Sequence, residues 1–588
     1  MRLLRIFRRV GPYYRDHLPA TIAGSACVIA SAAVGLQAPG VVRRAVDALS
    51  SGAPLSSVWR SAAIIVGIAA VSGVFLFAQR KLLVSVSRHL EHRLRVDLYA
   101  HLLRLPAGFY MRERVGDLLT RAVSDVGVVR MAVGPGLMYA LSTVFVALIT
   151  TVLMVRISPL LTVLTLAVLP LVAVSTRWFG HHIHVRWDQS QASLSRYTTR
   201  LQEHLVGLRV LRAYACEEAE IAALGERNLE YVGASSRVIT LTAFFQPLLQ
   251  ALTGISAVVV LGVGGNAVRN GSMTLGQFVE FNLYLVRMVW PMIAVGWVAN
   301  LVQRGAASMK RIEEIFAQPR PPDPVPAAHL GAATGEPAAL EVRNLTFAYP
   351  DASQPAVAGV GLHAAPGERI ALVGGVGSGK STLLSLLPRL LEPEPGRVLI
   401  DAVDVRSLPL AELRRHVALV PQGAFLFSAT LGQNIALARP EATADEIMSA
   451  ALAAGLEADL ARFPAGLDTV VGERGVTLSG GQRQRVAIAR ALIAKPRLLL
   501  LDDCLSAVDT QTERVILSSL PSCTLVFATH RLAAAEMCDR VLVLDRGRVV
   551  EAGTPGELAA RGGHYARLLA LQKLEQGVAV PERLAAEV

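Results

Sequence analysis

A glycine-rich run in the second half of the chain carries the clearest chemistry. Gly374-Gly375-Val376-Gly377-Ser378-Gly379-Lys380-Ser381 fits the pattern GxxxxGK[ST] of a phosphate-binding loop. Glycines at this spacing let backbone N–H groups turn toward phosphate oxygens, while the lysine reaches the outer phosphates and the serine hydroxyl can ligate magnesium. Residues 370–373 before the loop are predicted to be a strand, and the residues from Ser381 onward a helix, which is the context that the motif requires.

Two adjacent carboxylates follow a second hydrophobic run. Four leucines at residues 498–501 predict a buried strand, which ends in Asp502 and Asp503. A buried strand that ends in a carboxylate, together with a phosphate loop, predicts a nucleotide hydrolase. Asp503 stands where a catalytic glutamate would be expected, and it is one methylene shorter.

A third motif makes the prediction more specific. Leu478-Ser479-Gly480-Gly481-Gln482 precedes a predicted helix that runs through Leu492. This run, with the strand and Asp502 shortly after it, resembles the signature of ATP-binding cassette (ABC) proteins, and the resemblance covers essentially the whole chain. It implies ATP and Mg²⁺ as cofactors. One departure is Ala402, where the family commonly has the glycine of an Asp-Gly turn.

The resemblance assigns roles to residues outside the phosphate loop. Tyr349 is expected to stack on adenine, which suits a flat purine. Gln422 resembles the loop glutamine that touches magnesium and senses the membrane domain, while Asp502 holds the metal through water. His530 resembles the switch histidine that contacts the γ-phosphate. Residues 506–509 resemble the loop that communicates across a dimer.

In this family two cassettes pack head to tail, so each ATP lies between the phosphate loop of one and the LSGGQ run of the other. Ser479, Gly481 and Gln482 are therefore expected to act in trans, at the N-terminus of a helix that points toward the γ-phosphate. The predicted catalytic residues are Asp503, His530 and Gln422; the predicted nucleotide-binding residues are Tyr349, Gly374, Gly375, Gly377, Ser378, Gly379, Lys380, Ser381, Thr382, Ser479, Gly480, Gly481 and Gln482; and the predicted metal-binding residues are Ser381, Gln422 and Asp502.

The first half of the chain has the composition of a membrane domain. At 588 residues the chain exceeds the roughly 250 to 300 residues that one core sustains, so at least two domains are expected. Hydrophobic residues make up 52% and the mean hydropathy is +0.44, with the excess in the first half. Charge-free runs there reach the roughly 20 residues needed to cross a bilayer. Six spans are predicted, at residues 18–42, 61–78, 131–155, 157–176, 238–268 and 276–303.

The predicted fold is multi-domain: an all-α six-helix transmembrane domain followed by an α/β P-loop ATP-binding cassette. The transmembrane domain with its cytoplasmic helix extensions is predicted at residues 1–316, a Pro/Ala linker at 317–338, the cassette at 339–576 and a C-terminal tail at 577–588. Arginines near the N-terminus place that end in the cytoplasm, and an even number of spans returns the cassette there. A multi-pass protein of the cytoplasmic (inner) membrane without a cleavable signal peptide is expected.

Charge and cysteine content exclude other classes. The net charge of +12 is explained by basic cytoplasmic loops beside anionic lipid, so no nucleic-acid partner is expected. The five cysteines have no CxxC spacing, so neither a zinc site nor a disulfide framework is indicated. The cluster His181, His182 and His184 lacks thiol or carboxylate company and is interpreted as polar surface rather than a metal site.

Two loops of the membrane half resemble those of exporter-type half-transporters, in which short helices at the loop ends dock on the cassettes and transmit closure as rigid-body motion. Most importers of the superfamily lack them. The first loop carries Phe109, Tyr110, Gly116, Asp117, Leu118, Arg121 and Asp125, and the second carries Glu203, Gly207, Val210, Ala213 and Tyr214.

Glu280, Tyr284 and Arg287 fall at i, i+4 and i+7, which places them on one face of the sixth span. An ionisable pair in a membrane helix is costly unless it faces a wet cavity or a partner. One hypothesis is that this face lines the transport path. The alternative is that Glu280 lies at the outer interface and Arg287 snorkels toward headgroups or forms a structural pair.

Asp503 also indicates which kind of dimer the chain forms. A general base must lie within hydrogen-bond reach of the attacking water, and a shorter carboxylate is expected to fall short. The resemblance points the same way, because aspartate here is characteristic of the less active member of heterodimeric exporters. The chain is therefore interpreted as one half of a heterodimer, which contributes the weak ATPase site and lends its intact LSGGQ to a partner whose equivalent residue is glutamate.

Other interpretations stay open. Intact Gln422 and His530 leave a homodimer possible, with Asp503 as a slow base. An importer built on the exporter fold, as in some siderophore systems, is a further alternative, whereas non-transport members of the superfamily are soluble with tandem cassettes. The expected substrate is hydrophobic or amphipathic, and drugs, lipids and peptides fit equally.

Overall fold

The computed structural model describes residues 10–320, 329–331, 336–350, 352–472 and 478–575. These residues form two compact units. The membrane unit comprises Met1–Arg104 and Glu113–Pro319, and the cassette unit comprises Leu105–Arg112 and Arg320–Val588. The predicted order, a helical membrane domain followed by an α/β domain, is confirmed.

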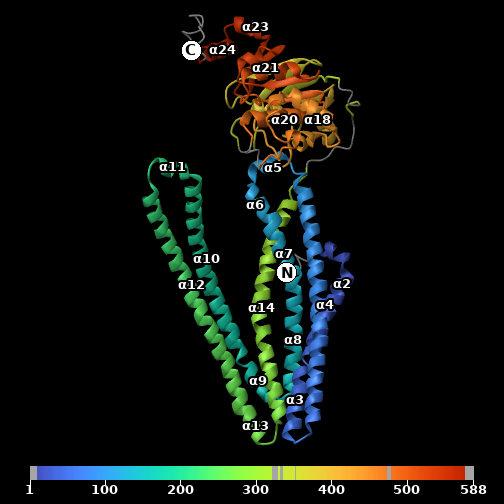
Figure 1. Ribbon diagram of the computed structural model, residues 1–588, viewed down its shortest axis with the longest axis vertical. Coiled ribbons are helices and arrows are strands. Elements are labelled where there is room, and N and C mark those ends of the chain that lie inside the picture. The colour runs from blue at the N-terminus through green and yellow to red at the C-terminus, as the bar shows by residue number, and fades with distance from the viewer. Residues whose placement is uncertain (1–9, 321–328, 332–335, 351, 473–477, 576–588) are drawn as a thin grey trace. The chain divides into compact units, whose positions relative to one another are not determined.

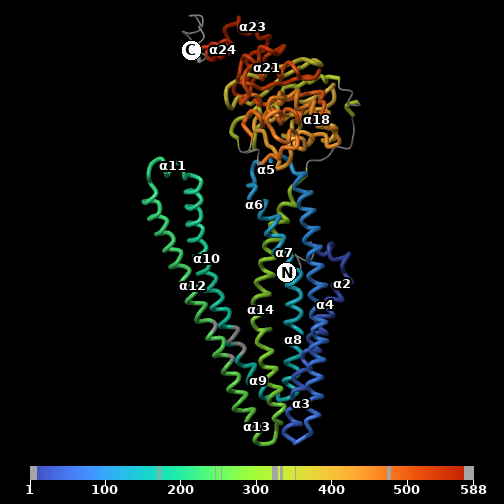
Figure 2. The backbone as a smooth tube through the Cα atoms, in the orientation of Figure 1, coloured from blue at the N-terminus to red at the C-terminus, as the bar shows by residue number. Residues whose placement is uncertain are grey.

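The membrane unit is entirely helical in the part that the structure describes (Figure 1). Its elements are α2 (Leu18–Gly35), α3 (Ala38–Ser50), α4 (Leu55–Leu102), α6 (Val115–Thr120), the π-helix η1 (Arg121–Asp125), α7 (Val126–Val133), α8 (Pro135–Ile157), α9 (Pro159–Leu166), α10 (Leu169–Val206), α11 (Leu208–Ala213), α12 (Glu217–Val259), the π-helix η2 (Val260–Gly264), α13 (Gly265–Arg269) and α14 (Leu275–Phe316). Helices α10 and α12 run side by side to the short helix α11, as Figure 2 shows.

The number of spans agrees only roughly with the prediction. Among the described residues, five helical segments are long and apolar enough to cross a membrane: Leu18–Ser50, Leu55–Leu102, Val115–Ile157, Glu217–Arg269 and Leu275–Phe316. The predicted span at residues 157–176 is not one of them, and it is divided between α9 and α10. Helix α9 begins at a serine N-cap, where the Ser158 hydroxyl accepts the Leu161 N–H, and it ends at Leu166. Apolar composition therefore continues across a break in the helix.

The cassette unit contains two sheets. Sheet one has the order β2-β1-β4-β5, and its paired strands are antiparallel. Sheet two has the order β10-β9-β3-β8-β7-β6, in which only the β10–β9 pair is antiparallel. The strands are β1 (Leu340–Phe347), β2 (Val357–Ala364), β3 (Arg369–Val373), β4 (Val398–Ile400), β5 (Val403–Asp404), β6 (Val417–Val420), β7 (Leu498–Asp502), β8 (Thr524–Ala528), β9 (Arg540–Asp545) and β10 (Arg548–Gly553).

Helices surround these sheets. They are α5 (Ala107–Arg112), α15 (Lys380–Leu386), α16 (Leu410–His416), α17 (Leu431–Ile435), α18 (Ala444–Ala453), α19 (Glu457–Leu460), α20 (Gly480–Leu492), α21 (Thr510–Ser519), α22 (Leu532–Ala535), α23 (Pro555–Ala560) and α24 (His564–Glu575), with 3₁₀ turns η3 (Val405–Ser407), η4 (Ala436–Ala438) and η5 (Gly466–Asp468). Strand β7 is buried on both faces: Leu499 and Leu501 pack into one hydrophobic cluster, and Leu498 and Leu500 into another. This explains why its sequence is a continuous leucine run, since a strand between two covered faces has no solvent side.

The turn at Ala402 is strained, which gives a stability prediction. Ile400 pairs with Val403, so Asp401 and Ala402 form a two-residue hairpin turn with φ of 48° and 65°. Such turns favour glycine at the second position, because the left-handed region is costly for a residue with a Cβ. Ala402→Gly is expected to raise the free energy of unfolding by about 0.5–1 kcal/mol, measured by urea unfolding.

The matched control is Ala461→Gly. Ala461 is also exposed, but its φ is −63°, an ordinary value for an L-residue. Glycine there relieves no strain and gives the unfolded chain more freedom, so stability is expected to stay equal or fall. If both variants shift stability equally, the strain at Ala402 is not the cause.

Candidate active site

The predicted catalytic segments meet because their strands are neighbours. The phosphate loop follows β3, Gln422 lies just after β6, Asp502 ends β7, and His530 lies just after β8. These four strands are parallel and adjacent in the order β3-β8-β7-β6, so their carboxyl ends lie at one edge of the sheet. In open α/β sheets this edge is where ligands bind.

The phosphate loop can accommodate glycine alone at its tightest point. Gly379 has φ of 103°, and a Cβ there would lie 2.4 Å from the Ala356 carbonyl oxygen. Lys380 begins α15 and turns back over the loop, where its Nζ donates to the carbonyl oxygens of Gly374 and Gly375 at 2.8 Å each. Burial lowers the pKa of the Lys380 ammonium. The loop therefore concentrates a partly desolvated positive charge beside exposed backbone.

The oxygen donors predicted for a metal lie together. The Ser381 hydroxyl donates to Asp502 Oδ1 at 3.0 Å, so the hydroxyl and the carboxylate that would share a magnesium ion are already adjacent. Hydroxyl, carboxylate and amide oxygens suit Mg²⁺, which prefers hard oxygen ligands. Burial raises the pKa of the Asp502 carboxyl above its usual range. This donor set fits the predicted ion.

The raised pKa gives a pH prediction. The folded chain holds the Asp502 proton more tightly than the unfolded chain, so this group's contribution to the free energy of unfolding falls as pH rises from about 3.9 through the folded-state pKa. Metal binding needs the ionised form. The gain in nucleotide affinity that Mg²⁺ provides is therefore expected to fall about tenfold per pH unit below the folded-state pKa.

Fluorescent-nucleotide titrations with Mg²⁺ and with EDTA, from pH 8 to pH 5, would measure this gain. The control is Asp502→Asn, in which the gain should be small at every pH. A gain in Asp502→Asn as large as that of the wild type at every pH would contradict the role of Asp502.

Asp503 is engaged on both carboxylate oxygens. Its Oδ1 lies 2.9 Å from Nδ1 of His530, and its Oδ2 accepts from Nε2 of Gln422 at 3.1 Å. Thus the three predicted catalytic side chains form one hydrogen-bonded group. Burial raises the pKa of the Asp503 carboxyl. The backbone is also unusual, since Asp503 has φ of 47°, a left-handed conformation that aspartate tolerates better than longer side chains.

Nine of the seventeen predicted site residues line one cavity of about 540 Å³. The lining includes Gly374, Gly375, Gly377, Lys380, Ser381, Gln422, Asp502, Asp503 and His530. Tyr349 lies at the far end of the loop, where its hydroxyl is 3.1 Å from the Thr382 hydroxyl. A phenol placed this way can offer its ring to a purine whose phosphates lie on the loop.

The LSGGQ residues lie outside this cavity. Ser479 is the N-cap of α20 and forms a capping box with Gln482, whose Nε2 also donates to Asp459 at 2.9 Å. Gly481 packs closely, because a Cβ there would lie 2.8 Å from the Ala507 carbonyl oxygen. The residues of the phosphate-loop cavity and the LSGGQ residues therefore lie in two separate places in one chain.

One wall of the cavity could not be predicted from the sequence. Leu568, Leu571 and Gln572 of α24 line it together with Leu532, and Oε1 of Gln572 accepts the Leu532 N–H at 2.9 Å. The spacing of these residues on one helix face is visible in the sequence, but it is the ordinary spacing of packing residues. Only the tertiary structure places this helix face against the cavity.

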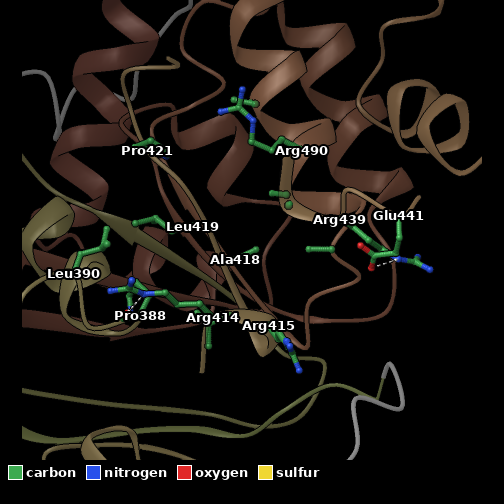
Figure 3. A pocket seen from close by; sticks show the side chains of 15 residues that line it. Pro388, Leu390, Arg414, Arg415, Ala418, Leu419, Pro421, Arg439, Glu441 and Arg490 are labelled. Atoms are coloured by element: carbon green, nitrogen blue, oxygen red, sulfur yellow. Dashed lines mark hydrogen bonds and ion pairs between the residues drawn. The ribbon is translucent and has the colours of Figure 1, made fainter. Parts of the chain in front are cut away.

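A second cavity, of about 610 Å³, lies beside the edge strand β6 (Figure 3). Pro421 lines it and immediately precedes Gln422. Its walls carry arginines that are held in place: Arg414 donates to the Pro388 carbonyl at 3.2 Å, and Arg490 donates to the Phe425 carbonyl at 3.0 Å. The segment that bears Gln422 therefore begins at the wall of this cavity.

Residues of the first exporter-like loop form ion pairs in the membrane unit. Asp117 pairs with Arg121 at 2.6 Å, and buried Asp125 accepts from Arg311 Nε and Ser308 at 2.8 Å each. The short helices predicted at the loop ends are present as α5 and α11. Phe109 of α5 is buried, whereas no residue of α11 is.

The ionisable face of the sixth span has a partner that the sequence did not indicate. Glu280 is buried, its Oε2 lies 3.5 Å from Nη1 of Arg43 on α3, and its Oε1 accepts from Tyr284 at 3.3 Å. The Tyr284 hydroxyl also donates to the Leu36 carbonyl at 3.0 Å. Glu280 therefore has a structural pair, with Arg43 rather than Arg287, while exposed Arg287 stays a candidate for the transport path.

The histidine cluster lies on α10 beside an aromatic side chain. His182 stacks on Trp178 with ring centroids 4.2 Å apart, and its Nδ1 lies 2.8 Å from the Trp178 carbonyl oxygen. His184 lies 3.8 Å from Asp188, one helical turn on, so the expectation that the cluster has no carboxylate neighbour was wrong. These contacts are those of a polar helix surface.

Comparisons with known proteins agree with this geometry. Residues 21–292 match the model of the ABC transporter transmembrane region, and residues 357–506 match that of the ABC transporter family. The multidrug resistance-like ATP-binding protein MdlA of Escherichia coli is 35% identical over 97% of both chains. An ATP-dependent lipid A-core flippase of Chromobacterium violaceum is 35% identical over 86% of this chain and 87% of its own.

The fold is also shared by a solved structure. A bacterial Atm1-family ABC exporter with ATP bound superposes with a TM-score of 0.75 at 27% identity, which covers 95% of this chain and 98% of that chain.

Proposed function

Since the chain belongs to the ABC exporter half-transporters, we propose that it is one half of a heterodimeric exporter and contributes the weak ATPase site. The family gives the coarser statement directly: the chain is a multi-pass membrane protein with an ATPase that is coupled to export. The observation that supports the finer proposal is Asp503, the short carboxylate at the centre of the Gln422–His530 group.

Different residues of the chain would carry the separate steps of ATP binding and hydrolysis. Lys380 would neutralise charge on the outer phosphates, and Ser381 and Asp502 would hold Mg²⁺ with Gln422 nearby. When bound, magnesium withdraws charge from the phosphate oxygens. His530 uses Nδ1 toward Asp503, which leaves Nε2 to face the γ-phosphate, and Nε2 can donate to a phosphate oxygen only in the imidazolium form.

Asp503 would take the proton of the attacking water. Its two oxygens already contact His530 and Gln422, so the carboxylate does not extend past these two side chains into the cavity. A glutamate would extend further into the cavity. This supports slow hydrolysis at this site, since a general base must lie within hydrogen-bond reach of the proton that it removes.

We propose the nucleotide-binding residues, the location, the domain limits and the substrate class from the family resemblance. The nucleotide-binding residues are Tyr349, Gly374, Gly375, Gly377, Ser378, Gly379, Lys380, Ser381 and Thr382 for this chain's ATP, and Ser479, Gly480, Gly481 and Gln482 for the partner's. The membrane is the cytoplasmic one, with the cassette in the cytoplasm, and the domain limits are those predicted above at residues 316, 338 and 576. A hydrophobic or amphipathic substrate suits the apolar helices, and the relatives' names include a multidrug and a lipid A flippase protein.

A homodimer is the second candidate, and one observation favours it. Asp503 contacts both Gln422 and His530, so the carboxylate occupies a catalytic position even though it is short. In a homodimer Asp503 would act as a slow base at two identical sites.

Native mass spectrometry of the transporter purified from its own host in nanodiscs tests the assembly. The heterodimer predicts one copy of this 62.7 kDa chain with one different chain, which has glutamate at the position equivalent to Asp503. A particle that contains only two copies of this chain would overturn the heterodimer and leave the homodimer.

A further inference from the structure

Arg531, the residue after His530, binds the backbone of the loop at residues 506–509. Its Nη1 donates to the Val508 carbonyl and its Nη2 to the Ser506 carbonyl, both at 2.7 Å. The same guanidinium pairs with buried Glu513 of α21 at 3.2 Å. A guanidinium can form this fork because its donors are fixed in one plane, whereas a lysine ammonium is a point charge.

The opposite side of the same loop is held by α20, the helix that begins at LSGGQ. Gln484 is buried, and its Oε1 accepts the Ala507 N–H at 3.0 Å while its Nε2 lies 3.4 Å from the Ser506 hydroxyl. One turn earlier, Gly481 lies against the Ala507 carbonyl so closely that no Cβ would fit. The loop is therefore clamped between Arg531 and the first turns of α20.

These contacts form a continuous link. Asp503 contacts His530, the next residue Arg531 holds Ser506 and Val508, and Gln484 connects the loop to α20. The Ser506 hydroxyl also donates to the Asp503 carbonyl at 2.9 Å, so the loop is fixed at its start as well. The His530 side chain is 58% exposed, whereas Gln484 and Glu513, which lie on either side of the loop at residues 506–509, are buried.

We propose that Arg531 is a positioning residue through which nucleotide at this chain's phosphate loop sets the orientation of α20, the helix that the chain presents to its partner's ATP. The proposal rests on the proposed function, because it takes ATP to bind at Lys380 and LSGGQ to act in trans. In an asymmetric exporter this link would let the weak site control the competent one without hydrolysing its own ATP. Coupling through such a link requires an element that both sites bias, and the loop at residues 506–509 is that element.

The test is hydrogen exchange in the full chain, reconstituted at one copy per nanodisc so that no second chain contributes. The probe is Mg²⁺-ATPγS, its binding is measured by displacement of a fluorescent nucleotide, and the readout is the nucleotide-induced change in exchange of α20 amides. The wild type should bind and show the change. In Arg531→Lys we expect nucleotide affinity within about twofold of wild type. The factor by which bound nucleotide changes the exchange rates of the α20 amides is expected to be about tenfold smaller, as for the loss of one hydrogen bond from a charged donor.

Two further variants show whether a lost response comes from the contacts of Arg531 and Gln484 with residues 506–509 or from a general loss of stability. Glu513→Gln keeps both carbonyl contacts of Arg531 and removes only the ion pair, so coupling should persist. Gln484→Leu cuts the link from the α20 side and should abolish coupling with binding intact, which keeps the test valid if Arg531→Lys unfolds. Thermal unfolding of each variant is recorded alongside.

The outcomes are distinct. If Arg531→Lys and Gln484→Leu keep the α20 response, or if Glu513→Gln loses it as fully as Arg531→Lys does, the clamp is not the link and the proposal is overturned. A wild type that binds but shows no α20 response also overturns this inference alone. A wild type that does not bind Mg²⁺-ATPγS overturns the proposed function, and the inference with it.

Discussion

Asp503→Glu will raise the steady-state ATPase rate of the purified chain, reconstituted at two copies per nanodisc so that each LSGGQ run can face the other copy's phosphate loop, about ten- to a hundredfold. A correctly placed general base contributes about 10²–10⁴-fold, and the short carboxylate already supplies part of this. In the wild type the carboxylate ends at His530 Nδ1 and Gln422 Nε2, 2.9 and 3.1 Å away. Glutamate adds one methylene in the direction of the cavity. The measurement is phosphate release with Mg²⁺-ATP in lipid nanodiscs, with Asp503→Asn as the variant that cannot accept the proton.

The glutamate variant carries a small structural cost. With φ of 47° at this position, aspartate is better tolerated than glutamate, so the melting temperature is expected to fall slightly even as activity rises. A stability change alone cannot produce a gain of rate. If the wild type already turns over well and Asp503→Asn abolishes turnover, Asp503 is a working base and the homodimer becomes the better interpretation.

Lys380→Met will reduce nucleotide affinity about a hundredfold and abolish any turnover gained through Asp503→Glu, because the outer phosphates lose the charge that neutralises them. The Lys380 ammonium is held over the loop by the Gly374 and Gly375 carbonyls and by the Ser378 hydroxyl at 3.1 Å. Methionine fills a similar volume and removes only the charge and these donors. Fluorescent-nucleotide titration and phosphate release in the Asp503→Glu background measure both effects.

The matched control is Lys495→Met. Lys495 is 69% exposed at its side chain and pairs with Glu446 at 3.2 Å, a surface ion pair worth under about 1 kcal/mol. This variant removes the same charge and should leave affinity and turnover unchanged. Equal losses in both variants would show that net charge, and not the position of Lys380, controls binding.

The arrangement of the predicted site residues was largely predictable because these residues belong to local motifs at strand ends. A phosphate loop between a strand and a helix, and a carboxylate at the end of a leucine run, each fix their own geometry within a few residues. Once β3, β8, β7 and β6 pair in that order, Lys380, Asp502, His530 and Gln422 must meet at one edge. The LSGGQ helix could be placed outside this edge only by resemblance.

Features that depend on long-range packing were not predictable. The partner of Glu280 is Arg43, more than two hundred residues away in the chain, and helical periodicity could identify only its near neighbour Tyr284. The same holds for the wall of the cavity contributed by α24. Hydropathy likewise registers apolar composition but not helix breaks, and this is why residues 157–176 were predicted as one continuous span and are divided between α9 and α10.

The wall formed by α24 also affects how the site is made during synthesis. The phosphate loop leaves the ribosome complete at Ser381, but Gln572, which holds the Leu532 amide beside the switch histidine, follows about 190 residues later. At ordinary translation rates this delay is on the order of ten seconds or more. Throughout that interval the nascent cassette has its phosphate-binding residues without the helix that closes their cavity. A message truncated within α24 would therefore yield a chain with every sequence motif present and an incomplete nucleotide site.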